Sequence, residues 1–365
     1  MNLFIYGTLL DDRLRRLVAG RQLDGTPAVL AGYRVEREQG GQLPVLCRGE
    51  GDQASGLILK DVPQSALDRL DAYEIPFGYQ RITEHISGIP VGVYLPPATM
   101  RTDGTAWVLA NWQATDGPLS LLAAEEIDAH HPALTARELS AQWHMIRHRA
   151  SSRLRASQPR PSTVRRPAGS VEIVDQSAPY GSFFKYSKMR LRHETFAGQM
   201  SDMLPREGFR GADAALILPY DPVRDRVLLV EQFRVGPTLR GDANPWALEP
   251  VAGMIDAGET PEQAARREAA EEAGLKVDAI VPMFSGYASP GNSSEYHYCM
   301  LALTDLPDRD SYFGGLADEA EDLRLHVVTL DQALEMVETA EISVLPLIAM
   351  LNWVARKRSS LRASA

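Results

Sequence analysis

Three carboxylates fall on one short stretch of the sequence, and their spacing suits metal-ion chemistry. Glu268 and Glu272 are four residues apart and Glu271 lies between them, so a helix would project all three from one face. Carboxylates crowded in this way repel one another unless a cation joins them, and Mg²⁺ or Mn²⁺ prefers such oxygen ligands. Glu259 and Arg267 lie close enough in the sequence to hold this face through charge-assisted hydrogen bonds. The stretch therefore predicts a divalent-cation site.

The residues around these carboxylates predict the helix that carries them. Thr260 can act as the N-cap, Pro261 suits the first helical position, and Gln263 completes a capping box. Gly274 can end the helix in a left-handed conformation. We therefore expect a helix over residues 260–273.

The whole segment GMIDAGETPEQAARREAAEEAGL, from Gly253 to Leu275, resembles the signature of the Nudix hydrolases. Every fixed position of G-x5-E-x7-R-E-U-x-E-E-x-G-U is filled, with the small Ala269 at the first apolar position. The resemblance extends from about Val171 to Trp353, where the chain looks like the ADP-ribose diphosphatase branch, including Pro290 sixteen residues after Gly274. It implies an α/β/α sandwich and Mg²⁺-dependent hydrolysis of ADP-ribose to AMP and ribose 5-phosphate.

The same resemblance implies roles for individual residues. The metal ligands would be the Ala252 carbonyl and the side chains of Glu268, Glu272 and Glu321, with Glu271 on the same acidic face. Glu319 would be the general base that deprotonates the attacking water. The substrate-binding residues would be Phe183, Phe184, Arg206, Glu207, Arg234, Ser289 and Glu295.

Some alternatives remain open for this half of the chain. Phe183 and Phe184 could be plain core residues, since aromatic side chains are usually buried. An arginine that the family places after its Arg-Glu pair falls on Gly211, which puts that contact in doubt. The substrate could be another nucleoside diphosphate derivative, or the domain could sense a nucleotide and regulate rather than cleave.

The N-terminal half carries a second group of motifs. The first apolar run ends in Tyr6-Gly7-Thr8-Leu9, where a glycine lets backbone amides approach a ligand closely. With LDAYE, which ends at Glu74, and the later GYQR, this turn resembles the gamma-glutamylcyclotransferase-like family over residues 1–115. The resemblance implies that the turn, from Tyr6 to Leu9, binds a γ-glutamyl group. Glu74 would shuttle a proton as the α-amine attacks the γ-carbonyl to give 5-oxoproline. A retained binding or dimerisation module is the alternative.

Length and composition set the outline. A chain of 365 residues predicts two domains. We expect an α+β protein with a gamma-glutamylcyclotransferase-like β-barrel with helices at 1–118, then a helical extension and basic Pro/Ser linker at 119–170. A Nudix sandwich at 171–365 would follow. The linker prediction rests on seven arginines and no acid between Arg147 and Arg166.

Charge and cysteine content bear on the binding partners and the cellular compartment of the protein. The net charge of −10 argues against nucleic-acid binding, and the sequence shows no membrane-spanning run. Two cysteines, Cys47 and Cys299, give no disulfide framework, so a reducing cytoplasm is expected. The diphosphatase resemblance implies a homodimer. The fusion of the two families also resembles proteins associated with tellurite resistance.

Overall fold

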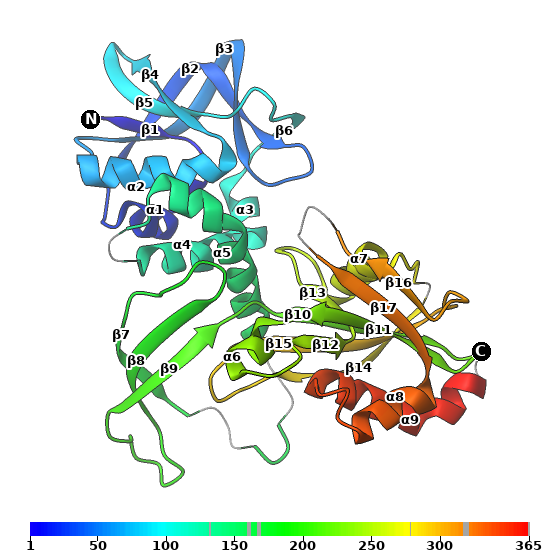
Figure 1. Cartoon of the computed structure of the whole chain (residues 1–365). Helices are drawn as coiled ribbons and strands as arrows, with labels where there is room; N and C mark the ends of the chain where they lie inside the picture. Colours follow the sequence, from blue (N-terminus) through cyan, green and yellow to red (C-terminus); the bar gives the residue numbers. More distant parts are fainter. Residues whose placement is uncertain (131–132, 159–161, 166–168, 278, 317–320, 364–365) are drawn as a thin grey trace. The chain divides into compact units, whose positions relative to one another are not determined.

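The computed structural model describes residues 1–130, 133–158, 162–165, 169–277, 279–316 and 321–363. By its internal contacts the chain forms two compact units, Met1–Glu207 and Gly208–Ala365 (Figure 1). Each unit is described by itself. The structure thus agrees with the expected α+β protein of two domains. In the described part of the chain, every helix is too short or too polar to cross a membrane.

The first unit contains a six-stranded half-barrel sheet in the order β4-β5-β1-β3-β2-β6. Its strands are β1 (Leu3–Ile5), β2 (Gly25–Glu38), β3 (Pro44–Leu59), β4 (Gln80–Ile86), β5 (Ile89–Leu95) and β6 (Thr102–Ala106). The short β1 runs parallel to β5 and antiparallel to β3. Its side chains alternate, so that Leu3 and Ile5 join a core shared with the helices while Phe4 packs into the other face. This strand delivers the Tyr6–Leu9 turn to the helical side.

In the described part of the first unit, five α-helices accompany this sheet. They are α1 (Asp12–Ala19), α2 (Gln64–Glu74), α3 (Leu109–Thr115), α4 (Gly117–Asp128) and α5 (Ala136–Ala156), with 3-10 turns η1 (Thr8–Leu10) and η2 (Ile75–Phe77). Two of these helices, α4 and α5, lie within the residues 119–170 for which the sequence predicts a helical extension and a linker, apart from the first turn of α4. Helix α5 continues to Ala156, which corrects the prediction that the basic stretch from Arg147 onward is linker. The reason is burial: Arg149 is paired with Glu126 inside the unit rather than solvated.

A three-stranded sheet lies at the end of the first unit, and its last strand runs past Glu207, the last residue of that unit. It consists of β7 (Val171–Gln176), β8 (Lys185–His193) and β9 (Leu204–Arg210), in that order. Lys185 at the start of β8 is fully buried and donates hydrogen bonds to Gln142 of α5 (2.5 Å) and to the Gly181 carbonyl (2.7 Å). These contacts group residues 171–207 with the N-terminal half. Compact units need not coincide with family boundaries, so the predicted limits 1–118, 119–170 and 171–365 stay a prediction.

The second unit is built on an eight-stranded mixed sheet. The main path is β14-β15-β10-β11-β17-β16, with β12 paired to β11 and β13 to β10. The strands are β10 (Ala214–Asp221), β11 (Arg226–Phe233), β12 (Trp246–Glu249), β13 (Val251–Met254), β14 (Ala279–Tyr287), β15 (Tyr296–Leu303), β16 (Ser311–Gly314) and β17 (Leu323–Thr329). The helices are α6 (Val235–Arg240), α7 (Pro261–Ala273), α8 (Leu330–Glu338) and α9 (Leu345–Ala363).

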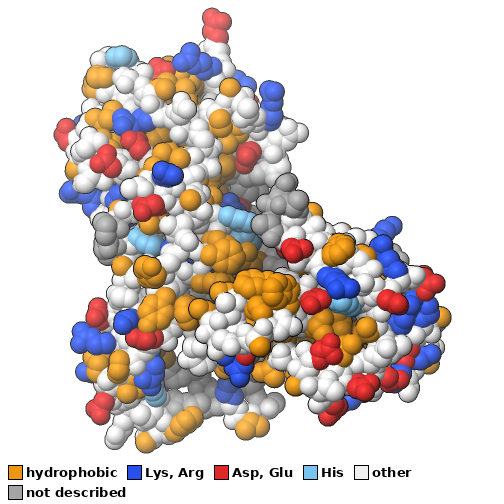
Figure 2. Space-filling view, in the orientation of Figure 1, with side chains coloured by type: hydrophobic (Ala, Val, Ile, Leu, Met, Phe, Trp, Pro, Cys, Tyr) orange, Lys and Arg blue, Asp and Glu red, His pale blue; other side chains and the backbone are white. Residues whose placement is uncertain are grey.

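Side chains of β10 show why this sheet is covered on both faces. Ala215 and Ile217 pack into the core that includes the alanines of α7, whereas Leu216 and Leu218 pack into the core under α8 and α9. A strand buried on both faces reads as a continuous apolar run, as AALILPY does. Helices on the two faces make the expected α/β/α sandwich (Figure 1). On the visible face of this unit, acidic and basic side chains are interspersed (Figure 2).

Candidate functional site

The helix that carries the acidic motif is capped at both ends as the sequence predicts. Thr260 Oγ1 accepts the Gln263 N–H at 3.2 Å, and Gln263 Oε1 accepts the Thr260 N–H at 2.8 Å. Gly274 ends α7 with φ of 63°, in the left-handed region. The buried alanines Ala264, Ala265 and Ala269 hold one face of α7 against the sheet. The small Ala269 thus fits close packing on the sheet.

Two carboxylates of this helix are buried beside the backbone of β13. Glu268 is 8% exposed and Glu272 is 2% exposed. Burial raises the pKa of Glu268 to about 7; Arg267 opposes this shift, while the charges of Glu271 and Glu321 add to it. Burial likewise raises the pKa of Glu272 to about 8, with further contributions from Glu268 and Glu321. Glu268, Glu271, Glu272 and Glu321 are therefore close enough to repel one another, as a cation-binding set does.

Arg267 orients this set from the same helix. Its guanidinium donates to Glu259 (3.0 Å), to Glu268 (2.6 Å) and to Glu271 (3.0 Å). It also donates to the Met254 carbonyl at 3.0 Å, which ties α7 to β13. The predicted holding role of Glu259 and Arg267 is thereby confirmed. A planar guanidinium with several donors can fix more than one carboxylate at once.

The backbone of β13 forms a close-fitting wall beside the carboxylates. The Ala252 N–H donates to Glu272 Oε2 at 3.2 Å. A Cβ placed on Gly253 would lie 1.8 Å from Glu268 Oε1, so only glycine leaves room for that carboxylate. Carboxylate oxygens beside a strand carbonyl are the ligands that hard divalent cations prefer, and this donor set fits such an ion.

Sequence reasoning missed a second close backbone contact with this helix, made by Gly314 and Gly315. The Gly315 N–H donates to the Glu272 carbonyl at 3.1 Å, and a Cβ on Gly314 would lie 2.0 Å from that oxygen. The next residue, Leu316, donates its N–H to Glu321 Oε2 at 3.1 Å. The paired glycines in GGLADEAED were the available signal, because adjacent glycines after a strand indicate close backbone approach.

The other site residues predicted for the second unit have fewer contacts that bear on their predicted roles. Arg234, directly after β11, forms an ion pair with Glu249 at 2.6 Å. Its charge lowers the pKa of Glu272, against the larger upward effect of burial. Ser289 and Glu295 lie in the loop between β14 and β15, where Glu295 lies 3.3 Å from His297. Glu319, the predicted general base, lies outside the described residues.

Four predicted nucleotide contacts belong to the first unit. Phe183 and Phe184 are 49% and 48% exposed, and their rings meet edge to face at 4.9 Å. The alternative that they are plain core residues is therefore wrong. Glu207 lies 3.3 Å from Lys188, and Arg206 donates to the Pro205 carbonyl. Their roles with a nucleotide stay predictions.

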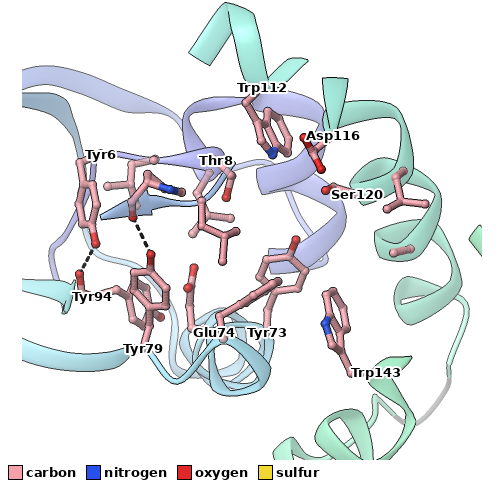
Figure 3. Close-up of a pocket in the computed structure, with 18 of the residues that line it drawn as sticks. Tyr6, Thr8, Tyr73, Glu74, Tyr79, Tyr94, Trp112, Asp116, Ser120 and Trp143 are labelled. Carbon is pink, nitrogen blue, oxygen red and sulfur yellow. Dashed lines mark hydrogen bonds between the residues drawn. The ribbon is translucent and has the colours of Figure 1, made fainter. Parts of the chain in front are cut away.

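The first unit contains a cavity of about 100 Å³ at the end of β1 (Figure 3). A cavity needs about 10–15 Å³ to hold one water molecule, so this cavity has room for a small molecule. It brings together the predicted Tyr6–Leu9 turn and Glu74. The lining also includes Tyr73, Phe77, Tyr79, Trp112, Asp116, Leu119, Ser120, Ala123, Trp143 and Arg147.

The turn at the end of β1 needs its glycine. A Cβ on Gly7 would lie 2.3 Å from Cγ of the Pro44 ring. Immediately after it the chain enters η1, and Leu10 donates its N–H to the Gly7 carbonyl at 2.9 Å. Tyr6 donates its hydroxyl to the Tyr94 carbonyl at 2.5 Å, so its ring is fixed at the cavity wall. Because the first amides of such a turn have no acceptor within it, they can bind a ligand.

Glu74 ends α2 and points toward the cavity (Figure 3). Burial raises the pKa of Glu74 to about 8, and the charge of Asp71 adds to the shift. Asp71 is kept ionised by hydrogen bonds from Arg81 (2.8 Å) and Tyr94 (2.8 Å), which lower its pKa against the opposing effect of burial. A carboxyl group with a pKa near neutrality can both accept and return a proton.

The fold and the carboxylate helix of the second unit together define a metal-dependent hydrolase of the Nudix type. A family profile described as "NUDIX domain" matches residues 211–348, and one described as "Gamma-glutamyl cyclotransferase, AIG2-like" matches residues 3–114. The chain belongs to the Nudix hydrolase family, fused to a gamma-glutamyl cyclotransferase-like domain. Nudix hydrolases use divalent metal ions.

Individual relatives agree with this assignment. The chain is 44% identical over 192 residues to the ADP-ribose pyrophosphatase of Escherichia coli (strain K12), covering 53% of this chain and 91% of that protein. It is 33% identical over 196 residues to the ADP-ribose pyrophosphatase of Haemophilus influenzae, covering 53% and 90%. It is also 33% identical over 149 residues to a GDP-mannose pyrophosphatase of Enterobacter, covering 41% and 76%. A solved structure titled as an ADP compounds hydrolase aligns with a TM-score of 0.39 and 22% identity, over 54% of this chain and 98% of that one.

Proposed function

We propose that the second unit hydrolyses ADP-ribose to AMP and ribose 5-phosphate with Mg²⁺, or Mn²⁺ in its place. The observation that carries this proposal is the pair of buried carboxylates, Glu268 and Glu272, held between Arg267 and the β13 backbone. The substrate is supported by the relatives named as ADP-ribose pyrophosphatases, one of them 44% identical over nearly its full length.

The residues of this unit suit the separate requirements of diphosphate hydrolysis. Glu268, Glu272 and Glu321, with the Ala252 carbonyl, would hold the cation, which supplies charge neutralisation at the diphosphate. Arg234, whose charge lowers the pKa of Glu272, would bind a phosphate oxygen through its guanidinium. Glu319 would take the proton of the attacking water. Ser289 and Glu295 would contact the terminal ribose, while Phe183, Phe184, Arg206 and Glu207 would contact the nucleotide.

The experiment is AMP release from ADP-ribose, measured with Mg²⁺ and with excess chelator. Glu272→Gln should lower kcat by about 100-fold or more, because several kcal/mol of transition-state stabilisation depend on a bound cation. Glu262→Gln is the matched control, since Glu262 lies on the same helix but pairs with Arg266 at the surface. Equal activity of the two variants would contradict the proposed site.

The substrate choice needs its own comparison. Rates on ADP-ribose, GDP-mannose, NADH and diadenosine polyphosphates should differ, with ADP-ribose the fastest. If another compound is hydrolysed faster, the chain is a Nudix hydrolase of that nucleoside diphosphate derivative. If ADP-ribose binds but is not cleaved, the unit senses the nucleotide instead.

We propose a second activity for the first unit, gamma-glutamyl cyclotransfer, with Glu74 as the group that moves the proton. The supporting observation is the cavity that joins the Gly7 turn to Glu74, whose pKa is raised to about 8. The test is release of 5-oxoproline from γ-glutamyl compounds. Glu74→Gln should abolish it without changing AMP release; if the wild-type protein releases none, the cavity only binds a ligand.

We also propose that the protein is a homodimer in the cytoplasm and binds no nucleic acid. The dimer rests on the diphosphatase resemblance, and the compartment on the two cysteines, which are both free. The domain limits 1–118, 119–170 and 171–365 belong to the same proposal. Light scattering coupled to gel filtration tests the dimer, and limited proteolysis tests the limits.

A further inference from the structure

One end of the cavity in the first unit is built by residues beyond the matched cyclotransferase span, which ends at residue 114. Helix α4 supplies Leu119, Ser120 and Ala123, with Asp116 at its N-cap, and α5 supplies Trp143 and Arg147. In Figure 3 Asp116, Ser120 and Trp143 lie across the cavity from Tyr6 and Tyr94, with Glu74 between the two ends. The helical extension therefore adds a wall that the matched span does not contain.

This added wall is fixed rather than loosely placed. Trp143 meets the rings of Tyr73 and Phe77 edge to face, with centroids 5.9 and 5.0 Å apart. Farther along α5, Arg149 and Glu126 are paired at 2.7 Å with side chains 0% and 1% exposed, which ties α5 to α4. A wall held by aromatic packing and a buried ion pair can present a side chain to a ligand in one position.

Arg147 is a half-buried cation on this wall. Its side chain forms no ion pair and no hydrogen bond with another described residue. Burial raises the pKa of the Tyr73 hydroxyl, and the charge of Arg147 partly opposes that rise. The other charged residue of this end, Asp116, instead accepts a hydrogen bond from Thr115 Oγ1 at 2.9 Å. The cavity thus offers a guanidinium to a ligand.

We propose that Arg147 binds the carboxylate of the amino acid that leaves when a γ-glutamyl amino acid is cyclised, with Trp143 against its apolar side chain. This inference rests on the proposed cyclotransferase activity. In that step the glutamyl α-nitrogen bonds to the γ-carbonyl carbon, and the amide bond to the leaving nitrogen breaks. Glu74 takes a proton from the attacking nitrogen and returns it to the leaving one, so the products are 5-oxoproline and a free amino acid.

Electrostatics favours an amino acid over a plain amine at this end. A leaving amine without a carboxylate becomes an ammonium ion, which a guanidinium repels. A carboxylate on the same carbon gives Arg147 a charge-assisted partner. The aromatic and aliphatic lining formed by Tyr73, Trp143 and Leu119 suits an apolar side chain.

The test compares two substrates that differ only in this carboxylate: γ-glutamyl-phenylalanine and γ-glutamyl-phenethylamide. Wild-type protein should release 5-oxoproline from the first with the higher kcat/KM. Arg147→Met should lower kcat/KM for γ-glutamyl-phenylalanine by about 10- to 100-fold, because that substrate loses a charged hydrogen bond. The phenethylamide rate should not fall, because that substrate has no carboxylate and the variant removes the cation that repels its leaving amine. Arg147→Lys should recover part of the loss.

Arg137→Met is the matched control, because Arg137 lies on the same helix with an exposed side chain. It should leave both rates unchanged. Equal losses on the two substrates, or none, would overturn the role of Arg147 while the cyclotransferase stands. No 5-oxoproline from either substrate would overturn the cyclotransferase itself. Circular dichroism of Arg147→Met checks that α5 is intact, and the lysine variant preserves the test if it is not.

Discussion

Replacing Gly253 by alanine should separate activity from stability in the second unit. The added Cβ would lie 1.8 Å from Glu268 Oε1. Ordinary contact between such atoms begins near 3.4 Å, so the carboxylate must move by about 1.5 Å. That movement is inexpensive for folding, because the carboxylate is the far end of a flexible side chain. It is expensive for a cation site, where a misplacement of about 1 Å can cost about 100-fold in rate.

We therefore expect Gly253→Ala to lower AMP release from ADP-ribose by about 100-fold, with a free energy of unfolding within about 1 kcal/mol of wild type. The control is Gly236→Ala in α6, where a Cβ would meet nothing within 4 Å. The double variant Gly253→Ala/Glu268→Gln should be no slower than Glu268→Gln alone, since both changes remove the same carboxylate.

Three outcomes would count against this reasoning. Full activity of Gly253→Ala would show that the position of Glu268 is unimportant. A large loss of stability with proportionate loss of activity would show that β13, rather than the carboxylate, is disturbed. Additive losses in the double variant would show that Gly253 acts on something other than Glu268.

Three further predictions concern charge and packing. Metal-free protein should lose stability as the pH rises from about 5 to about 8, because Glu268 and Glu272 have pKa values raised to about 7 and about 8 and must ionise while buried. Mg²⁺ should accordingly raise Tm more at pH 8 than at pH 6, and an equal rise would contradict this. Glu126→Gln should cost about 3–5 kcal/mol in urea unfolding, since it leaves Arg149 buried without its anion; a loss below about 1 kcal/mol would refute it. Gly7→Ala should cost about 1–3 kcal/mol and reduce 5-oxoproline release, because its Cβ would lie 2.3 Å from a rigid proline ring, and unchanged values would show that the ring yields.

The local structure around each motif could be predicted because short-range physics determines it. Thr260, Gln263 and Gly274 mark the ends of α7 through hydrogen bonds within a few residues, and the structure has these bonds. The apolar run AALILPY indicates a strand, and the structure has β10 there. The roles of Gly314 and Arg147 could not be predicted in this way, because each depends on a neighbour distant in the sequence or on a cavity that exists only in the folded unit.

The basic stretch after residue 146 shows why composition failed there. Arg147 and Arg149 stand two positions apart on α5, which places them on different sides of the helix. One side faces α4, where Glu126 neutralises Arg149; the other faces the cavity, where Arg147 forms no ion pair with a described residue. An average over seven arginines treats both as solvated charge. For Arg149, the ion pair with Glu126 offsets the energetic cost of burying the cation. For Arg147, we infer that the carboxylate of a bound ligand offsets this cost. Helix geometry therefore separates a structural arginine from a ligand-binding one where charge density alone predicts only a linker.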